Sequence, residues 1–188
     1  GHRTWITLAA AVSVAAAAAA CSDSSGPSGP SQPGDTRPAP SLNVVRRAAT
    51  APEFVDTVVT FYAVRGKDRE GAIYFKDPEG GDGEEFVKLS VGAASLLARP
   101  DGSPIAQGDS VLITMRVVDP ALLIVEFLPS GLQFNPQQPA EMEMEYGEGD
   151  DDYNEDGHHD STDTTIEGTL GIWKQEQPGQ PFVRLTSN

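Results

Sequence analysis

The stretch SVLITMRVV, residues Ser110–Val118, indicates the fold class of this chain. Its apolar residues Val111, Ile113, Met115 and Val117 occupy every second position. Successive side chains of a β-strand point to opposite faces of a sheet, so this period of two predicts a strand with one buried face. The core is therefore expected on the side of the sheet that these four residues share.

The segments on either side repeat this kind of pattern. Short runs rich in β-branched and aromatic residues are separated by turns rich in Gly, Pro and Asp, and no long helical period interrupts them. This combination predicts an all-β chain that folds as an antiparallel β-sandwich. The other strands are expected at Asp56–Val64, Gly71–Phe75, Phe86–Val91, Leu122–Phe127, Glu141–Tyr146, Thr169–Trp173 and Phe182–Leu185.

Two of these segments carry a more specific expectation. Leu122–Phe127 is apolar enough to predict a central strand. The sequence EMEMEY, Glu141–Tyr146, alternates strictly between glutamate and a larger apolar or aromatic residue. This alternation predicts that Met142, Met144 and Tyr146 point inward and that the glutamates point outward.

The N-terminal segment has the composition of a secretory signal. Trp5–Ala20 is almost unbroken apolar sequence, about as long as a signal core needs and too short and alanine-rich for a membrane-spanning helix. Its end, Ala18-Ala19-Ala20-Cys21, resembles the lipobox of bacterial lipoproteins. The resemblance implies cleavage before Cys21 and lipidation of that cysteine, whereas the alternative is an ordinary signal peptide with an incidental cysteine. Ser22 in place of aspartate favours the outer membrane.

Three regions are therefore expected along the chain. Residues 1–20 are predicted to be a lipoprotein signal peptide. Residues 21–52 hold the lipidated cysteine and a Ser/Gly/Pro-rich segment, which buries too little apolar surface to fold and is predicted to be a disordered linker. Residues 53–188 are predicted to form the β-sandwich domain, with an acidic loop at 147–165.

Part of the predicted domain resembles a known family. The segments GAASL (Gly92–Leu96), Gly108–Ser110, PSGLQF (Pro129–Phe134) and Pro139-Ala140 are similar to the pattern of ZU-type β-sandwich domains. Such domains occur in ankyrins, netrin receptors, zonula-occludens scaffolds and bacterial surface proteins. The resemblance covers roughly residues 86–146, and it implies a β-sandwich with an interaction role. The His-Phe-Ser site at which some ZU-type domains cleave themselves has no counterpart here, so no autoproteolysis is expected.

Negative charge is concentrated in the second half of the chain. The formal net charge is -15, which argues against nucleic acid and anionic lipid surfaces as partners because both would repel the protein. No Lys or Arg occurs from Val117 to Trp173, and Glu145–Asp163 holds nine carboxylates. A cation is the counter-charge that this segment needs if it is to be ordered.

The acidic loop contains a metal-binding pattern. Residues 152–157 read DYNEDG, which matches the D-x-N-x-D-G opening of an EF-hand calcium loop. In such a loop, oxygens at positions one, three and five converge on a hard cation, and a glycine at six permits the sharp turn. A backbone carbonyl at position seven adds a ligand. The predicted calcium ligands are Asp152, Asn154, Asp156, His158, Asp160 and Asp163.

This loop departs from the usual pattern in its last position and in its flanks. Asp163 stands at position twelve, where glutamate usually coordinates through both oxygens, and His159 takes the place of an apolar residue. A predicted strand precedes the loop, and only Ser161–Thr169 could form a helical turn or two. The expectation is therefore an EF-like loop inserted in a β-domain, with a solvated acidic loop as the alternative.

Other chemistries fit these residues less well. Zinc could bind His158, His159 and Asp160, but adjacent residues rarely close one site and no cysteine or third histidine is nearby. A hydrolase built on Ser161 would need a positioned base and an oxyanion pocket, for which the loop gives no sign. A carbohydrate-stacking role for Trp173 is a further alternative.

The function expected from the sequence is non-catalytic. The chain is predicted to be a lipid-anchored, extracytoplasmic domain that contacts the membrane through its anchor, binds an unidentified protein or glycan partner, and carries a calcium-ordered loop. A metal-dependent envelope enzyme and a carbohydrate-binding module are the alternatives from other classes.

Overall fold

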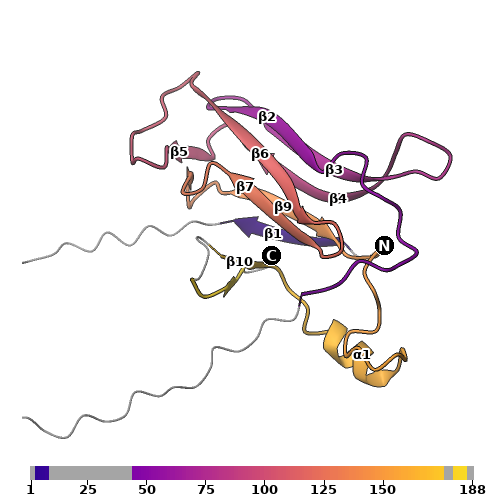
Figure 1. Cartoon of the computed structure of the whole chain (residues 1–188). Helices are drawn as coiled ribbons and strands as arrows, with labels where there is room; N and C mark the ends of the chain where they lie inside the picture. Colours follow the sequence, from indigo (N-terminus) through magenta and orange to yellow (C-terminus); the bar gives the residue numbers. More distant parts are fainter. Residues whose placement is uncertain (1–2, 9–43, 176–179, 186–188) are drawn as a thin grey trace, which may run out of the picture.

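The computed structural model describes residues 3–8, 44–175 and 180–185. Within these ranges the chain consists mostly of antiparallel strands, with one short helix (Figure 1), so the prediction of an all-β, sandwich-like fold is confirmed. The elements are β1 (Arg3–Leu8), β2 (Val58–Val64), β3 (Arg69–Lys76), β4 (Asp82–Val91), β5 (Leu96–Ala98), β6 (Ser110–Asp119), β7 (Ile124–Leu128), β8 (Gln133–Phe134), β9 (Ala140–Glu145), α1 (Ser161–Glu167), β10 (Trp173–Lys174) and β11 (Val183–Arg184).

Two sheets form the body of the molecule. One has four strands in the order β1-β9-β4-β3, and the other has three in the order β2-β6-β7. Two-stranded pairs, β5 with β8 and β10 with β11, complete the described strands. Side chains from the inner faces of the two larger sheets form a single apolar cluster, as expected when one face of each sheet is covered by the other.

Strand β6 confirms the alternation predicted from its sequence. Val111, Ile113, Met115 and Val117 are all buried, and none exposes more than 6% of its surface. The full length of β2 pairs antiparallel with β6, from Val58 opposite Arg116 to Val64 opposite Ser110. The pairing places β6 at the centre of its sheet, with β7 on its other side.

An irregularity in β4 adds an aromatic residue to the core. Ile73 pairs with Val87, but the next residue of β3, Tyr74, pairs with Glu85, so Phe86 is an extra residue in the register. Such a β-bulge lets two consecutive side chains share one face of the sheet, and Phe86 and Val87 are both fully buried. The ring of Phe86 lies 5.6 Å from that of Phe75.

The position of β7 corrects one expectation. Leu122–Phe127 was predicted to be a central strand, but β7 lies at the end of the three-stranded sheet and pairs only with β6 among the described strands. Its side chains are half-buried or exposed. The apolar composition is explained by contacts with the core, because Leu123, Val125 and Phe127 pack against it from the edge.

Strand β9 follows the predicted alternation only in part. Met142 is buried and Met144 is half-buried against the core, whereas Glu141 is exposed as expected. Glu143 and Glu145 expose only 7% and 6% of their surface. Lys88 of the neighbouring β4 donates to Glu143 at 2.8 Å, which compensates a charge that sequence alone placed in solvent.

The folded region begins before the expected boundary at residue 53. Residues 44–52, assigned above to the linker, lie against the sandwich. The Arg47 amide donates to Ala121 O at 3.0 Å, and the Ala48 amide donates to Glu148 O at 2.9 Å. This short extended segment therefore joins the chain before β7 to the start of the acidic loop.

Part of the expected signal segment also has a described backbone. Arg3–Leu8 forms β1, which pairs antiparallel with all six residues of β9. Cys21, the other residues from 9 to 43, and the predicted cleavage site lie outside the described residues. Within the ranges that are described, no helix has the length and apolar character that crossing a membrane requires.

Candidate metal site

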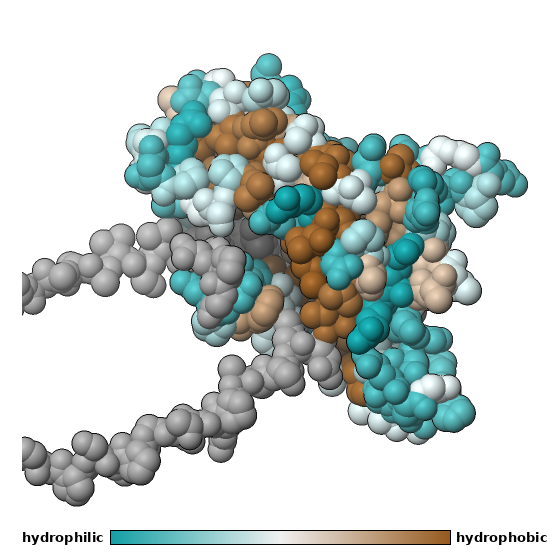
Figure 2. Space-filling view, in the orientation of Figure 1, coloured by the Kyte–Doolittle hydropathy of each residue, from teal (hydrophilic) through white to brown (hydrophobic). Residues whose placement is uncertain are grey.

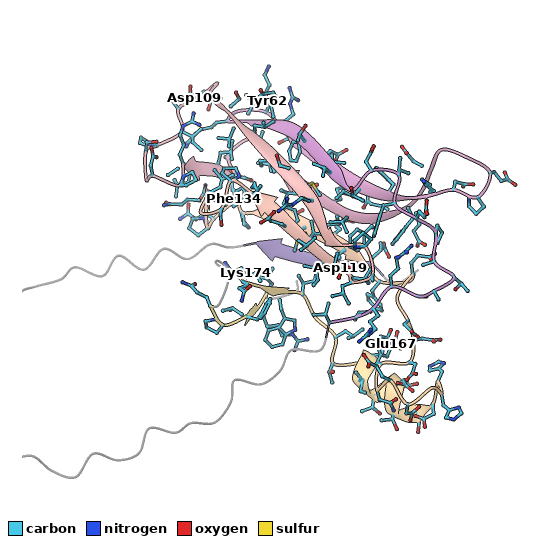
Figure 3. All side chains as sticks on the ribbon, in the orientation of Figure 1. Tyr62, Asp109, Asp119, Phe134, Glu167 and Lys174 are labelled. Atoms are coloured by element: carbon cyan, nitrogen blue, oxygen red, sulfur yellow. The ribbon has the colours of Figure 1, made fainter. Side chains whose placement is uncertain are left out.

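The acidic loop and α1 project from one end of the sandwich. The loop follows β9 and leads into α1, and Glu167 on this helix lies well away from the sheets (Figure 3). Hydrophilic side chains cover this region (Figure 2). The loop is attached through residues 46–48: the Asp150 amide donates to Arg46 O at 2.7 Å, and the Arg46 guanidinium contacts Glu155 at 2.8 Å.

Asp152 organises the first half of the loop. Its two carboxylate oxygens accept hydrogen bonds from the amides of Asp156 at 3.1 Å and Gly157 at 2.7 Å. The chain folds back around this carboxylate because Glu155 and Gly157 both adopt positive φ, 59° and 87°. Glycine reaches that region without strain, so Gly157 stands where the sharp turn requires it.

Asn154 and Asp156 continue the same turn. Asn154 Oδ1 accepts from the Asp156 amide at 2.9 Å, and Asn154 Nδ2 donates to Asp156 Oδ2 at 3.1 Å. Asp156 Oδ1 accepts from the amide of His158 at 2.9 Å. The three residues predicted for positions one, three and five therefore lie on consecutive, linked turns of one loop.

Asp163 links the loop to the helix. Its Oδ1 accepts from the Asn154 amide at 3.1 Å and its Oδ2 from the Asp160 amide at 2.9 Å, and the side chain is fully buried. Asp160 in turn caps α1 by accepting from the Thr162 amide at 2.6 Å. The two aspartates form a capping box, in which each side chain accepts from the backbone of the other end of the first turn.

The environment of Asp163 favours its ionised form. Hydrogen bonds from backbone amides, that of Asp160 first, hold the pKa of the Asp163 carboxyl below its ordinary value, although burial acts in the opposite direction. The carboxylate therefore stays charged where the loop meets α1. Position twelve is thus occupied by a negative charge that the fold itself keeps in place.

Tyr153 follows Asp152 in the loop, and its side chain is half-buried. Burial, followed by the nearby charge of Glu167, raises the pKa of its phenol to about 12. It lines a groove of about 680 Å³ between the loop, α1 and residues 44–46. Val45, Leu122 and Ile166 are among the apolar residues that line this groove. The groove therefore has an apolar wall beside the polar residues of the loop.

The predicted ligands have the chemistry that a calcium ion requires, and the chain follows the path of a calcium loop. Their side chains, however, do not all point toward one position. Asp152, Asn154 and Asp156 each have a side-chain oxygen, the ligand atom that Ca²⁺ prefers. Asp152 and Asp156 each accept two hydrogen bonds. Because a carboxylate has about four lone-pair sites, further sites remain for a cation. In the part of the chain that is described, no three His, Cys, Asp or Glu side chains are gathered as metal ligands, since these carboxylates turn toward separate amides.

The remaining predicted ligands have different surroundings. The side chain of His158 is exposed, so its expected contribution is the backbone carbonyl of position seven. Asp160 caps the helix. His159 Nδ1 lies 3.4 Å from Asp151 Oδ2, and both side chains are exposed. Among the described residues, the two histidines and Asp160 that could bind zinc do not form one donor set.

The residues that attach the loop were not predicted from the sequence. Arg46 and the extended segment around it were assigned to the linker, yet they pair with residues 148–150. The apolar pair Val44-Val45 within a Ser/Pro-rich stretch could have indicated that this segment is folded. Both side chains are half-buried in the structure.

Comparisons of this chain with protein-family models, with curated protein sequences and with solved structures give no match.

Proposed function

We propose that this protein is a non-catalytic, lipid-anchored, extracytoplasmic β-sandwich domain whose acidic loop binds Ca²⁺. The observation that carries the proposal is the path of the loop from Asp152 to Asp163. The chain turns at positive φ at Glu155 and Gly157, and it ends on a buried, ionised Asp163 at position twelve. The linked turns of Asp152, Asn154 and Asp156, with Asp163 accepting from the Asn154 amide, support an EF-type loop.

The charge of the loop supports a cation as its ligand. Nine carboxylates lie between residues 145 and 163. The exposed Arg46 lies beside one of them, Glu155, and His159 lies beside another, Asp151. A bound divalent ion would reduce the repulsion among these carboxylates and stabilise the folded loop. Aspartate in place of glutamate at position twelve shortens the reach of that ligand, so we expect an affinity in the weak range of extracellular modules, on the order of 10⁻⁴–10⁻³ M.

Calorimetric titration of Ca²⁺ into the protein tests this proposal. We expect saturable binding and a raised Tm, both lost in Asp152→Ala and Asp156→Ala. Asp56→Ala is the matched control, because Asp56 is an exposed aspartate before β2 and far from the loop in sequence. Equal binding by all four proteins would place the ion elsewhere, and no binding by the wild type would leave a solvated acidic loop.

The anchor is proposed from the lipobox-like sequence before Cys21. A single acyl chain gives only marginal membrane binding, whereas several together hold a protein firmly, since each buried methylene contributes about 0.8 kcal/mol. Labelled palmitate should therefore be incorporated when the chain is expressed in a bacterial host, and Cys21→Ser should abolish incorporation and release the protein from membranes. Incorporation that persists in Cys21→Ser would contradict the assignment.

The interaction role is proposed from the ZU-type resemblance of residues 86–146 together with the sandwich-like fold. ZU-type domains are interaction modules, so an unidentified protein or glycan is the expected partner. The acidic surface favours a partner that carries positive charge.

A further inference from the structure

The outer edge of β9, the one that does not face β4, pairs with another strand. In the structure β1 occupies it: Arg3 pairs with Glu145, and the register continues without a shift to Leu8 opposite Ala140. All six residues of β9 thus have a strand partner on that side. Removal of residues 1–20, which the proposed function requires, would leave this edge open, and an open edge strand is a ready template for pairing.

The two faces of β9 define which strand would fit. On the inner face, Ala140 and Met142 belong to the buried core and Met144 packs against it. The other face carries Glu141, Glu143 and Glu145 at every second position, an acidic ladder in which Glu141 is exposed. With β1 in place, Glu143 and Glu145 are buried, and Lys88 of β4 contacts Glu143. A strand added to this edge would therefore place apolar residues beside the methionines and its alternate residues beside three carboxylates.

We propose that the outer edge of β9 accepts an extended, alternately basic segment of a partner protein, which adds antiparallel to β9 in the place that β1 occupies. This inference rests on the proposed function, because it assumes that the mature chain lacks residues 1–20. Backbone hydrogen bonds would supply the pairing, and lysine or arginine opposite the glutamates would supply the selectivity.

A second copy of the chain fits this edge poorly. When two β9 strands pair antiparallel, every register that keeps the methionines on the core side sets glutamate opposite glutamate. In the symmetric register centred on Glu143, that residue faces its own copy and Glu141 faces Glu145. Like charges directly opposite each other destabilise a strand pair, so the ladder opposes self-pairing and favours a basic strand.

The probe is the peptide KVKVKV, whose lysines match the three glutamates and whose valines match the inner-face residues in the register of β1. It is titrated by fluorescence anisotropy into two forms of the protein. One is the processed chain, expressed with its own N-terminal segment in a bacterial host and checked by mass spectrometry, and the other is the unprocessed chain. We expect the processed chain to bind KVKVKV and the unprocessed chain to bind it at least tenfold more weakly. The control peptide EVEVEV, in which glutamates replace the lysines, should not bind to either form.

Two N-methylated peptides separate strand addition from simple charge attraction. N-methyl groups are placed on one alternate set of amides in the first peptide and on the other set in the second. Because only one set of amides of an added strand faces its neighbour, one peptide should lose binding and the other should keep it. Two peptides that bind equally would overturn the proposal.

Charge reversal on the edge tests the acidic ladder. Glu141→Lys, at the exposed position of the ladder, should weaken binding of KVKVKV about tenfold, since a cross-strand attraction becomes a repulsion. Glu79→Lys, an exposed glutamate in the turn after β3, is the matched control and should leave binding unchanged. Equal effects of the two variants would contradict an edge site.

The remaining outcomes separate this inference from the proposed function. If mass spectrometry shows no processing, the anchoring proposal fails, and Ile6→Pro in the unprocessed chain then frees the edge because proline cannot pair within β1. Binding by that variant would support the acceptor edge on its own. No binding by either freed form, or a dimer of the processed chain that occupies the edge in sedimentation, would overturn the inference.

Discussion

At the scale of single residues, one glycine determines how closely two strands approach. Gly71 of β3 is buried, and a Cβ at this position would lie 2.4 Å from the ring of Phe61 on β2. No side chain fits there unless the ring moves. The contact joins the two larger sheets, so a change at Gly71 acts on the core itself.

Gly71→Ala should lower the free energy of unfolding by about 1–3 kcal/mol, because overpacking forces the Phe61 ring out of place. Urea denaturation followed by circular dichroism measures the change. Gly168→Ala is the control: this glycine ends α1 in a helical conformation, and the nearest atom to its Cβ would be 3.5 Å away. A Gly71→Ala protein as stable as the wild type would refute the close approach.

Asp163 gives a prediction about pH. Its pKa is lower in the folded protein than the ordinary value of 3.8, so its stabilising effect is complete above that pH and is lost as the pH falls through the lower folded pKa. Asp163→Asn should therefore reduce stability at neutral pH, and the difference from the wild type should shrink below pH 3.8. Urea denaturation across the acid range tests this. A difference that is the same at every pH would contradict the role of the charge.

At the scale of elements, the acidic loop depends on a chain segment distant in sequence. Gly149 lies where residues 45–48 pass the start of the loop, and a Cβ there would be 2.8 Å from Val45 Cγ1 and 2.9 Å from Tyr146 O. The loop is therefore held by close packing of the Val45 side chain against the Gly149 backbone, as well as by its own hydrogen bonds.

Gly149→Ala should loosen this attachment, and amide hydrogen exchange of residues 150–163 should become faster while exchange in β4 and β6 is unchanged. Gly168→Ala again serves as the control, because it alters a glycine near the loop without a close contact. Unchanged exchange in the loop of Gly149→Ala would show that residues 45–48 do not support it.

Elements with a local sequence signal were predicted well. The alternation of β6 and the helical turn at 161–167 depend on neighbours along the chain, and both were found. Position in the sheet was not predictable in this way: β7 is an edge strand despite its apolar sequence, because its side chains reach the core from the side. The burial of Glu143 depends on Lys88 of another strand.

In the candidate site too, local features were predictable from the sequence and contacts between distant residues were not. The spacing of Asp152, Asn154 and Asp156 could be recognised from the sequence, since the turn is local. The roles of Asp163 and Asp160 in the capping box, and the support from Arg46, follow from contacts that only the folded chain makes.

At the scale of the whole molecule, charge has a consequence for stability. With a net charge of -15, like charges repel one another in the folded state more than in the expanded chain. In EDTA, which removes calcium, raising the salt concentration from about 0.02 to 0.5 M should raise the Tm by a few degrees because the ions screen this repulsion. A Tm that falls with salt, measured by differential scanning calorimetry, would contradict it.

The central claim, a cation site in the loop from Asp152 to Asp163, is tested most directly by terbium luminescence. Tyr153 lies next to Asp152 in the loop, so a Tb³⁺ ion bound there should show emission sensitised by this ring. We expect emission that Ca²⁺ displaces, that Tyr153→Phe strongly reduces, and that Asp156→Ala abolishes. Emission that is equally strong in Asp156→Ala, or no sensitised emission from the wild type, would contradict a metal site in this loop.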